Sequence, residues 1–138
     1  MAMSEDEEIR TILTRYKTVA VVGASRDPSK DAHTVPRYLK AKGYRVVPVN
    51  PFADEILAEK AYKSLKDIPF PIDIVDIFRP SNQVGPVVDD ALETEAKVIW
   101  MQLGIRNEEA AEKARAAGRK VIQDRCMRIE VERLAGRA

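Results

Sequence analysis

The chain has 138 residues, of which 45% are hydrophobic and 33% charged, and a formal net charge of +1. This balance is that of one soluble globular domain over residues 1–138, and the near-neutral charge argues against general affinity for nucleic acid or membranes. No apolar run approaches the ~20 residues that span a bilayer, and the acidic start MAMSEDEE does not resemble a signal peptide, so we expect a cytoplasmic protein. Cys126 is the only cysteine and His33 the only histidine, which excludes an intrachain disulfide and argues against cysteine-cluster or histidine-rich metal sites.

The first patterns in the chain predict a helix followed by a buried strand. Ser4 and Glu7 form a capping-box pair ahead of apolar residues at helical spacing, which predicts a helix over residues 5–16 that packs on the domain. The β-branched run over residues 18–22 is typical of a strand buried on both faces.

The next segment has the pattern of a loop, a helix and a strand. After the loop 23–31, apolar residues at helical spacing predict a helix that Gly43 ends. Pro36 fits only the first turn of that helix, because a proline further in lacks the N–H that the helix needs. A strand follows over residues 45–49, and Pro48 within it indicates a short strand or a poorly paired neighbour.

The rest of the chain continues the alternation of strands and helices. Residues 52–70 are less regular, with a short helix near 54–59 and a small strand at 61–62. The later patterns predict a strand over 72–78, a helix capped by Ser81, a strand over 97–103, a helix from Asn107 to Gly118, a strand over 120–122 and a final helix over 129–134. Such alternation implies a parallel sheet with right-handed crossovers, so we predict an α/β, Rossmann-like three-layer sandwich with a mostly parallel sheet.

A ligand is expected at the strand ends, because open parallel sheets bind ligands beyond the carboxyl ends of their strands. In the first of these loops Gly23 permits a sharp turn, Ser25 offers a hydroxyl, and Arg26 and Lys30 offer positive charge to a phosphate. The following helix N-terminus also favours an anion. The alternative is that Gly23 is only a β–α turn and Arg26 a solvated charge.

NAD fits this loop poorly. The dinucleotide fingerprint G-x-G-x-x-G is absent. The second strand ends in Val49-Asn50-Pro51, where a dinucleotide site needs an acidic residue for the ribose hydroxyls. Asp54 lies just beyond and is a weak substitute.

Ordered motifs run through the chain: VAVVGASRDPSK, GYRVVPVNP, IDIVDIFRP, VIWMQLGIRNEEA and QDRC. Together they resemble the small stand-alone CoA-binding proteins, which are similar to the CoA-binding domain of the succinyl-CoA synthetase α subunit. The resemblance covers residues 9–134, with a local departure at Ala58, where these proteins often carry glycine. It implies a Rossmann-like domain that binds coenzyme A, free or acylated, across the strand ends, and it fixes no reaction.

The resemblance also assigns residues to parts of this ligand. Around the nucleotide phosphates and the ribose phosphate it places Gly23, Ala24, Ser25, Arg26 and Lys30. Along the adenosine and the far wall it places Asn50, Pro51, Phe78, Arg79 and Val84. Toward the pantetheine arm it places Gln102 and Leu103. It includes no metal ligand and no catalytic residue.

Other polar residues have a structural interpretation beside a functional one. Cys126 is either a buried small residue, which we favour, or a thiol partner for CoA activated by neighbouring arginines. His33 is expected in a structural or capping role. Asp73 and Asp76 lie three apart in one strand and so face opposite sides, one at the strand end and the other hydrogen-bonded.

We therefore expect a CoA-binding or regulatory module without established catalysis. The alternative is an enzyme of acyl-CoA or CoA-thiol/disulfide chemistry that uses Cys126. No nucleic acid or membrane partner is expected, while a protein partner or a homo-oligomer stays open.

Overall fold

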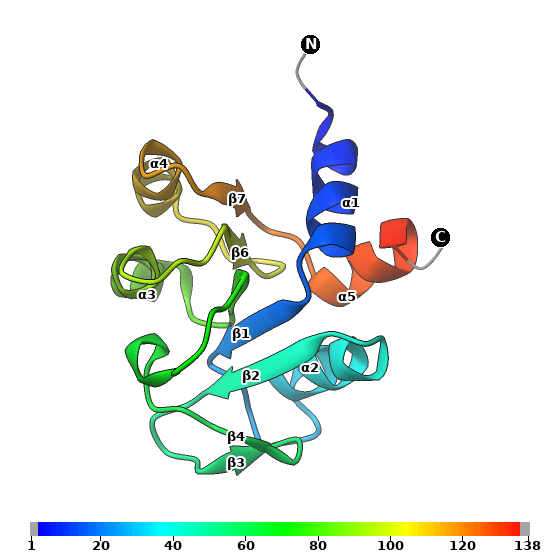
Figure 1. Ribbon diagram of the computed structural model, residues 1–138, viewed down its shortest axis with the longest axis vertical. Helices are drawn as coiled ribbons and strands as arrows, with labels where there is room; N and C mark the ends of the chain where they lie inside the picture. The colour runs from blue at the N-terminus through cyan, green and yellow to red at the C-terminus, as the bar shows by residue number, and fades with distance from the viewer. Residues whose placement is uncertain (1–2, 136–138) are drawn as a thin grey trace.

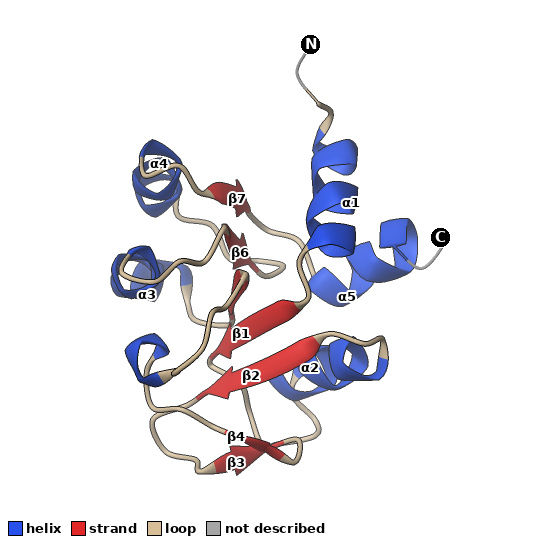
Figure 2. Ribbon diagram, viewed as in Figure 1, coloured by secondary structure: helices blue, strands red, loops and turns tan. Residues whose placement is uncertain are grey.

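Five parallel strands form the centre of the molecule in the computed structural model, which describes residues 3–135 (Figures 1 and 2). In chain order they are β1 (Thr18–Val22), β2 (Arg45–Val49), β5 (Ile74–Ile77), β6 (Val98–Met101) and β7 (Lys120–Ile122). Their spatial order is β2-β1-β5-β6-β7, and each neighbouring pair is parallel. All carboxyl ends therefore meet at one edge, and the strand order reverses between β1 and β5. The predicted α/β, Rossmann-like class is confirmed.

Helices cover both faces of this sheet and make it the middle of three layers (Figure 1). One face carries α1 (Glu5–Arg15), α2 (Asp31–Ala41) and α5 (Met127–Glu130), the last continued by a π-helical turn over Val131–Ala135. The other face carries α3 (Val84–Leu92) and α4 (Glu108–Ala116). Each outer layer of helices packs on the sheet through its own apolar cluster, so the two faces of the sheet are buried separately. Among the described residues, no helix has the length and apolarity needed to cross a bilayer.

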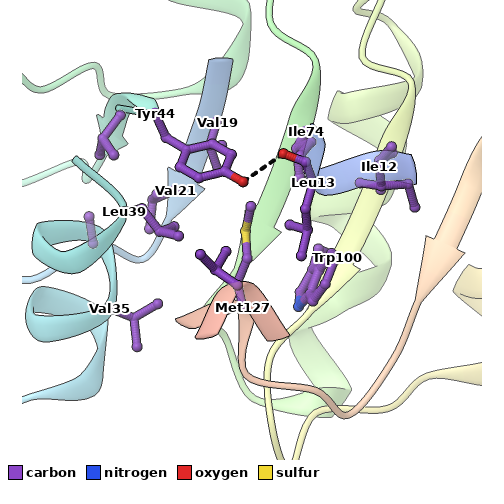
Figure 3. Packing of buried hydrophobic residues seen from close by; sticks show 14 of the residues in the cluster. Ile12, Leu13, Val19, Val21, Val35, Leu39, Tyr44, Ile74, Trp100 and Met127 are labelled. Atoms are coloured by element: carbon purple, nitrogen blue, oxygen red, sulfur yellow. Dashed lines mark hydrogen bonds between the residues drawn. The ribbon is translucent and has the colours of Figure 1, made fainter. Parts of the chain in front are cut away.

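The N-terminal helix belongs to the first of these clusters. The predicted capping box is present, since Ser4 Oγ accepts the Glu7 N–H at 3.1 Å and the Glu7 carboxylate reaches back to Ser4. The inner face of α1 is fully buried at Ile9, Ile12 and Leu13. Figure 3 shows the Tyr44 hydroxyl donating to the Leu13 carbonyl, at 2.6 Å, inside this cluster. Burial raises the pKa of Tyr44 to about 12.

Pro36 lies in the second turn of α2, because the helix begins at Asp31, so the prediction that it fits only the first turn was wrong. A helical residue at that position would donate its N–H to the Ala32 carbonyl. The N–H of Ser25 donates to that carbonyl instead, at 3.1 Å. The proline is tolerated because the Ala32 carbonyl, which has no helical donor, bonds to the preceding loop through Ser25.

Strand β2 lies at the edge of the sheet, which agrees with the expectation drawn from Pro48. The Pro48 carbonyl points away from β1 and accepts the Tyr62 N–H at 2.9 Å. The N–H and the carbonyl of one strand residue point to the same side, so the N–H that proline lacks would not have bonded to β1. The small strand predicted at 61–62 is this single bridge of Tyr62 to Val49.

The short helix predicted near 54–59 was wrong. The segment forms a hairpin of β3 (Glu55–Ile56) and β4 (Glu59–Lys60). Its turn residues Leu57 and Ala58 both have positive φ, 57° and 61°, as a two-residue hairpin turn of type I′ requires. The hairpin was missed because neither turn residue is one of those that favour this conformation.

The two predicted helix caps have different outcomes. Asn107 caps α4, where its Oδ1 accepts the Ala110 N–H at 3.0 Å. Ser81 does not cap α3, because a 3₁₀ turn over Ser81–Gln83 precedes that helix. Its Oγ accepts the Arg106 N–H at 3.1 Å instead and joins the loops after β5 and β6. The other predicted elements are present with ends shifted by a few residues.

Candidate functional site

The loop after β1 touches the chain that leaves β5, at the point where the strand order reverses. Gly23 has a φ of +90°, and a Cβ at this position would lie 2.5 Å from the Phe78 carbonyl oxygen. Its N–H donates to the Val49 carbonyl at 3.0 Å. The glycine is therefore required by close backbone packing between the ends of β2 and β5, which supports the turn interpretation.

The rest of this loop is held by its own hydrogen bonds. Ser25 Oγ accepts the Asp27 N–H at 3.0 Å, which leaves the hydroxyl proton free to be donated. His33 Nδ1 donates to the Ser25 carbonyl at 2.8 Å, which is the structural role expected for this histidine. Asp27 Oδ1 accepts the Ser29 N–H and hydroxyl at 2.9 and 2.7 Å, and these bonds lower the pKa of Asp27.

Two backbone amides of the loop keep their hydrogen-bonding capacity. The N–H groups of Ala24 and Arg26 donate to no acceptor within residues 3–135. The side chains of Arg26 and Lys30 are exposed beside them. Free amides next to cations are the usual means by which a loop holds an anion.

Asn50 links this loop to the turn after β2. Its Nδ2 donates to the Ala24 carbonyl at 2.9 Å, and its Oδ1 accepts the Phe52 N–H at 2.7 Å. Both polar atoms of the amide are thus used within the protein. Asn50 positions two strand-end loops relative to each other.

Two hollows lie at the strand ends, on opposite sides of the Gly23 contact. The α2–α5 hollow has a volume of about 400 Å³, and its walls include Val35, Phe78, Gln102, Leu103, Cys126 and Ile129. The β2–α3 hollow has a volume of about 410 Å³, and its walls include Gly23, Asn50, Pro51, Phe52, Lys63 and Arg79. The walls of the first also include Arg128 and the two carboxylates Asp31 and Glu132, whereas those of the second hold the cations Lys63 and Arg79 with one carboxylate, Asp90.

The structure brings most of the residues assigned from sequence to these hollows. The residues that line one of them are Gly23, Asn50, Pro51, Phe78, Arg79, Gln102 and Leu103. The assigned residues that line neither are Ala24, Ser25, Arg26, Lys30 and Val84. Ala24 and Val84 are buried in the two cores and support the walls from behind. Ser25 lines neither hollow and Arg79 lines only the β2–α3 hollow, so the expectation that these two residues face one common crevice was wrong.

Sequence reasoning missed several wall residues. Phe52 is 86% exposed at the mouth of the β2–α3 hollow, and its position directly after Asn50-Pro51 was the available signal. Lys63 and Ser64 lie across from it, and Lys63 Nζ donates to the Pro51 carbonyl at 3.3 Å. No sequence signal pointed to these two, because they come from the irregular segment between β4 and β5.

Of the two aspartates of the third predicted strand, Asp73 lies at the strand end as predicted, and Asp76 differs from the prediction. Asp73 lies just before β5, and its Oδ2 accepts the N–H groups of Lys17 and Thr18 at 3.3 and 3.2 Å. Asp76 is fully buried, and neither carboxyl oxygen has a partner within residues 3–135. The expectation of a hydrogen-bonded Asp76 was therefore wrong. Burial raises the pKa of Asp76 well above its ordinary value.

Cys126 is half-buried and lines the α2–α5 hollow, so it is not sealed in the core as the favoured interpretation held. The neighbouring arginines are already paired. Arg125 Nε donates to Glu5 Oε1 at 2.9 Å, and Arg128 Nε donates to Glu132 Oε1 at 2.9 Å. Arg128 lines the same hollow as the Cys126 thiol, and its guanidinium is shared with Glu132.

Comparison with known proteins adds independent information. A family model described as a CoA binding domain matches residues 17–132. The protein YneT of Bacillus subtilis is 47% identical over 122 residues, which are 88% of this chain and 90% of that protein. A solved structure of a hypothetical protein from Pyrococcus horikoshii OT3 is 46% identical, with a TM-score of 0.93 over 98% of this chain and 94% of that chain. ADP-forming acetate–CoA ligase II of Archaeoglobus fulgidus is 34% identical over 110 residues, which are 78% of this chain and 16% of the ligase.

Proposed function

We propose, from the premise that this chain belongs to the CoA-binding domain family, that it binds coenzyme A across the carboxyl ends of β1, β2, β5 and β6. The observation that carries the proposal is the pair of hollows on either side of the Gly23 contact: cations outnumber carboxylates in the β2–α3 hollow, whereas the α2–α5 hollow has no excess of cations and has apolar wall residues such as Phe78, Leu103 and Ile129. CoA has the same division, with a phosphorylated nucleotide at one end and an uncharged pantetheine arm at the other. A binding or regulatory module fits this arrangement without a reaction.

The β2–α3 hollow suits the adenosine end with its 3′-phosphate. Lys63 and Arg79 supply positive charge, and an arginine fork matches phosphate geometry. The exposed Phe52 ring offers a face on which an adenine can stack. Asp90 on the same wall lies 3.7 Å from Lys66, which offsets its negative charge.

The loop after β1 suits the diphosphate, which joins the two ends of CoA. The free amide of Arg26 and the hydroxyl proton of Ser25 are donors for phosphate oxygens. Arg26 and Lys30 add mobile positive charge from the exposed side. From here the pantetheine arm would run past Phe78 toward Gln102 and the α2–α5 hollow.

Calorimetric titration with CoA and with dephospho-CoA tests the proposal. We expect CoA to bind about tenfold or more tightly, because a charge-assisted hydrogen bond to the 3′-phosphate contributes about 1.5–3 kcal/mol. Arg79→Gln should remove most of this difference, whereas Arg115→Gln, on the exposed face of α4, should keep it. Negligible heat with both ligands would refute the proposal.

A second candidate function is CoA-thiol/disulfide exchange, and the observation that favours it is the position of Cys126 in the α2–α5 hollow. The Cys126 thiolate would attack one sulfur of CoA disulfide, forming a mixed disulfide and releasing one CoA thiolate. Incubation with CoA disulfide followed by intact-mass measurement tests this, with Cys126→Ser as the control. A native protein that gains no CoA mass would reject exchange and leave the binding proposal unaffected.

A further inference from the structure

Gln102 places an unused hydrogen-bond donor in the α2–α5 hollow. The residue follows β6 and is only 4% exposed. Its Oε1 accepts the Met127 N–H at 3.0 Å, and because a backbone N–H can only donate, this bond fixes which end of the amide is oxygen. The NH₂ group therefore faces away from Met127.

This NH₂ group has no protein acceptor within residues 3–135. Among the described side chains, only the two oxygens of Asp76 are both inaccessible to solvent and without a hydrogen-bond partner. The Gln102 NH₂ is not among these atoms, so it is still accessible to solvent. Since Gln102 lines the α2–α5 hollow, the donor points into that hollow. A nearly buried donor of this kind gains from a carbonyl acceptor on a ligand, whereas a free thiol is a weak acceptor.

One wall of the hollow around this donor is apolar and partly exposed, and the rest is lined by Asp31, Thr34, Arg128 and Glu132. Leu103, from the loop after β6, is 63% exposed, and Ile129 of α5 is 50% exposed. They are two of only four large hydrophobic side chains that the described residues expose. Val35 and Phe78 complete the wall toward α2 and β5. An alkyl chain in the hollow would cover both exposed side chains, which the thiol end of free CoA would not.

We propose that the α2–α5 hollow is an acyl pocket and that the preferred ligand is an acyl-CoA with a short alkyl chain. The Gln102 NH₂ donates to the thioester carbonyl, and the chain packs between Leu103, Ile129 and Phe78. This inference rests on the proposed function, because the nucleotide end must lie along the strand ends for the thioester to reach the hollow. The amide carbonyls of the pantetheine arm are the other source of an acceptor for Gln102, and the experiment distinguishes the two.

Calorimetric titration with CoA, acetyl-CoA, butyryl-CoA and hexanoyl-CoA tests the acyl pocket. The expected affinity rises roughly two- to four-fold for each added methylene, as for alkyl groups partly or fully removed from water. Equal affinities for all four ligands would overturn the inference while the CoA-binding proposal stands. Absence of binding by all four would overturn both.

The ratio of hexanoyl-CoA affinity to CoA affinity, measured in three variants, shows which residues contact the acyl group. Ile129→Thr should lower this ratio, whereas Met3→Gln, which removes an exposed apolar side chain outside the hollow, should not. Gln102→Glu keeps an oxygen for the Met127 N–H and, once its carboxyl is ionised, has no donor, so at a pH above the pKa of that carboxyl the ratio should fall about tenfold. If Gln102→Glu weakens CoA and hexanoyl-CoA equally, the acceptor is a pantetheine amide and the thioester contact is refuted. Thermal unfolding of each variant confirms that it is folded.

Discussion

Asp76 makes the protein's stability depend on pH in a direction opposite to that of most carboxylates. It sits in β5 in register with Val21 of β1 and Trp100 of β6, fully buried and without a hydrogen-bond partner within residues 3–135. Burial disfavours the charged form, so the pKa of Asp76 is raised in the folded protein. In the unfolded chain an aspartate ionises near its ordinary pKa of about 3.9.

The sign and size of the effect follow from this difference. Between about pH 3.9 and the folded-state pKa of Asp76, the carboxyl is protonated when folded and ionised when unfolded. Unfolding then releases a proton, so raising the pH lowers the free energy of unfolding by about 1.4 kcal/mol per pH unit. The stabilising contribution is complete below the unfolded pKa and is lost as the pH rises through the folded pKa.

Asp76→Asn should remove this pH dependence, because the amide has nearly the same shape and stays neutral. Urea unfolding of native protein and variant at half-unit steps from pH 4 upward measures it. The free energy of unfolding of Asp76→Asn minus that of the native protein should increase by about 1.4 kcal/mol per pH unit. The value of this difference at the lowest pH is set by the cost of burying the new amide. Asp54→Asn, at an exposed position, is the control and should show no such slope. A constant difference between Asp76→Asn and native protein would refute the reasoning.

Three other substitutions test the contacts that build the site and the core, each by urea unfolding. Gly23→Ala should cost about 2–5 kcal/mol, because its Cβ meets the Phe78 carbonyl and its φ is +90°; a loss below ~1 kcal/mol would contradict the close contact. Asn50→Asp should cost about 1–3 kcal/mol, since a carboxylate cannot donate to the Ala24 carbonyl, and unchanged stability would show that this bond is unimportant. Tyr44→Phe should cost about 1–3 kcal/mol through the buried carbonyl left without a donor, and an unchanged midpoint would argue against that bond.

Local patterns in the sequence were enough to predict the class of fold and the edge of the sheet at which a ligand is expected. Buried strands are continuous apolar runs and amphipathic helices repeat every 3.6 residues, so both leave local patterns. Once the strands are known to be parallel, their carboxyl ends must share one edge. The assignment of Gly23, Asn50, Arg79 and Gln102 to that edge needed no coordinates.

How those residues divide between the two hollows, and which of their hydrogen-bonding groups stay free, depends on contacts that form only in the folded protein. Pro36 is acceptable because Ser25, from a preceding loop, uses the carbonyl that it leaves free. The Gln102 oxygen is taken by the Met127 N–H, which leaves the NH₂ free. Asp76 is unpaired because its neighbour Val21 has no polar group and its neighbour Trp100 donates its indole N–H to the Arg125 carbonyl. Such partners lie far apart in the chain, and their pairing depends on strand register and helix packing, which no local pattern encodes.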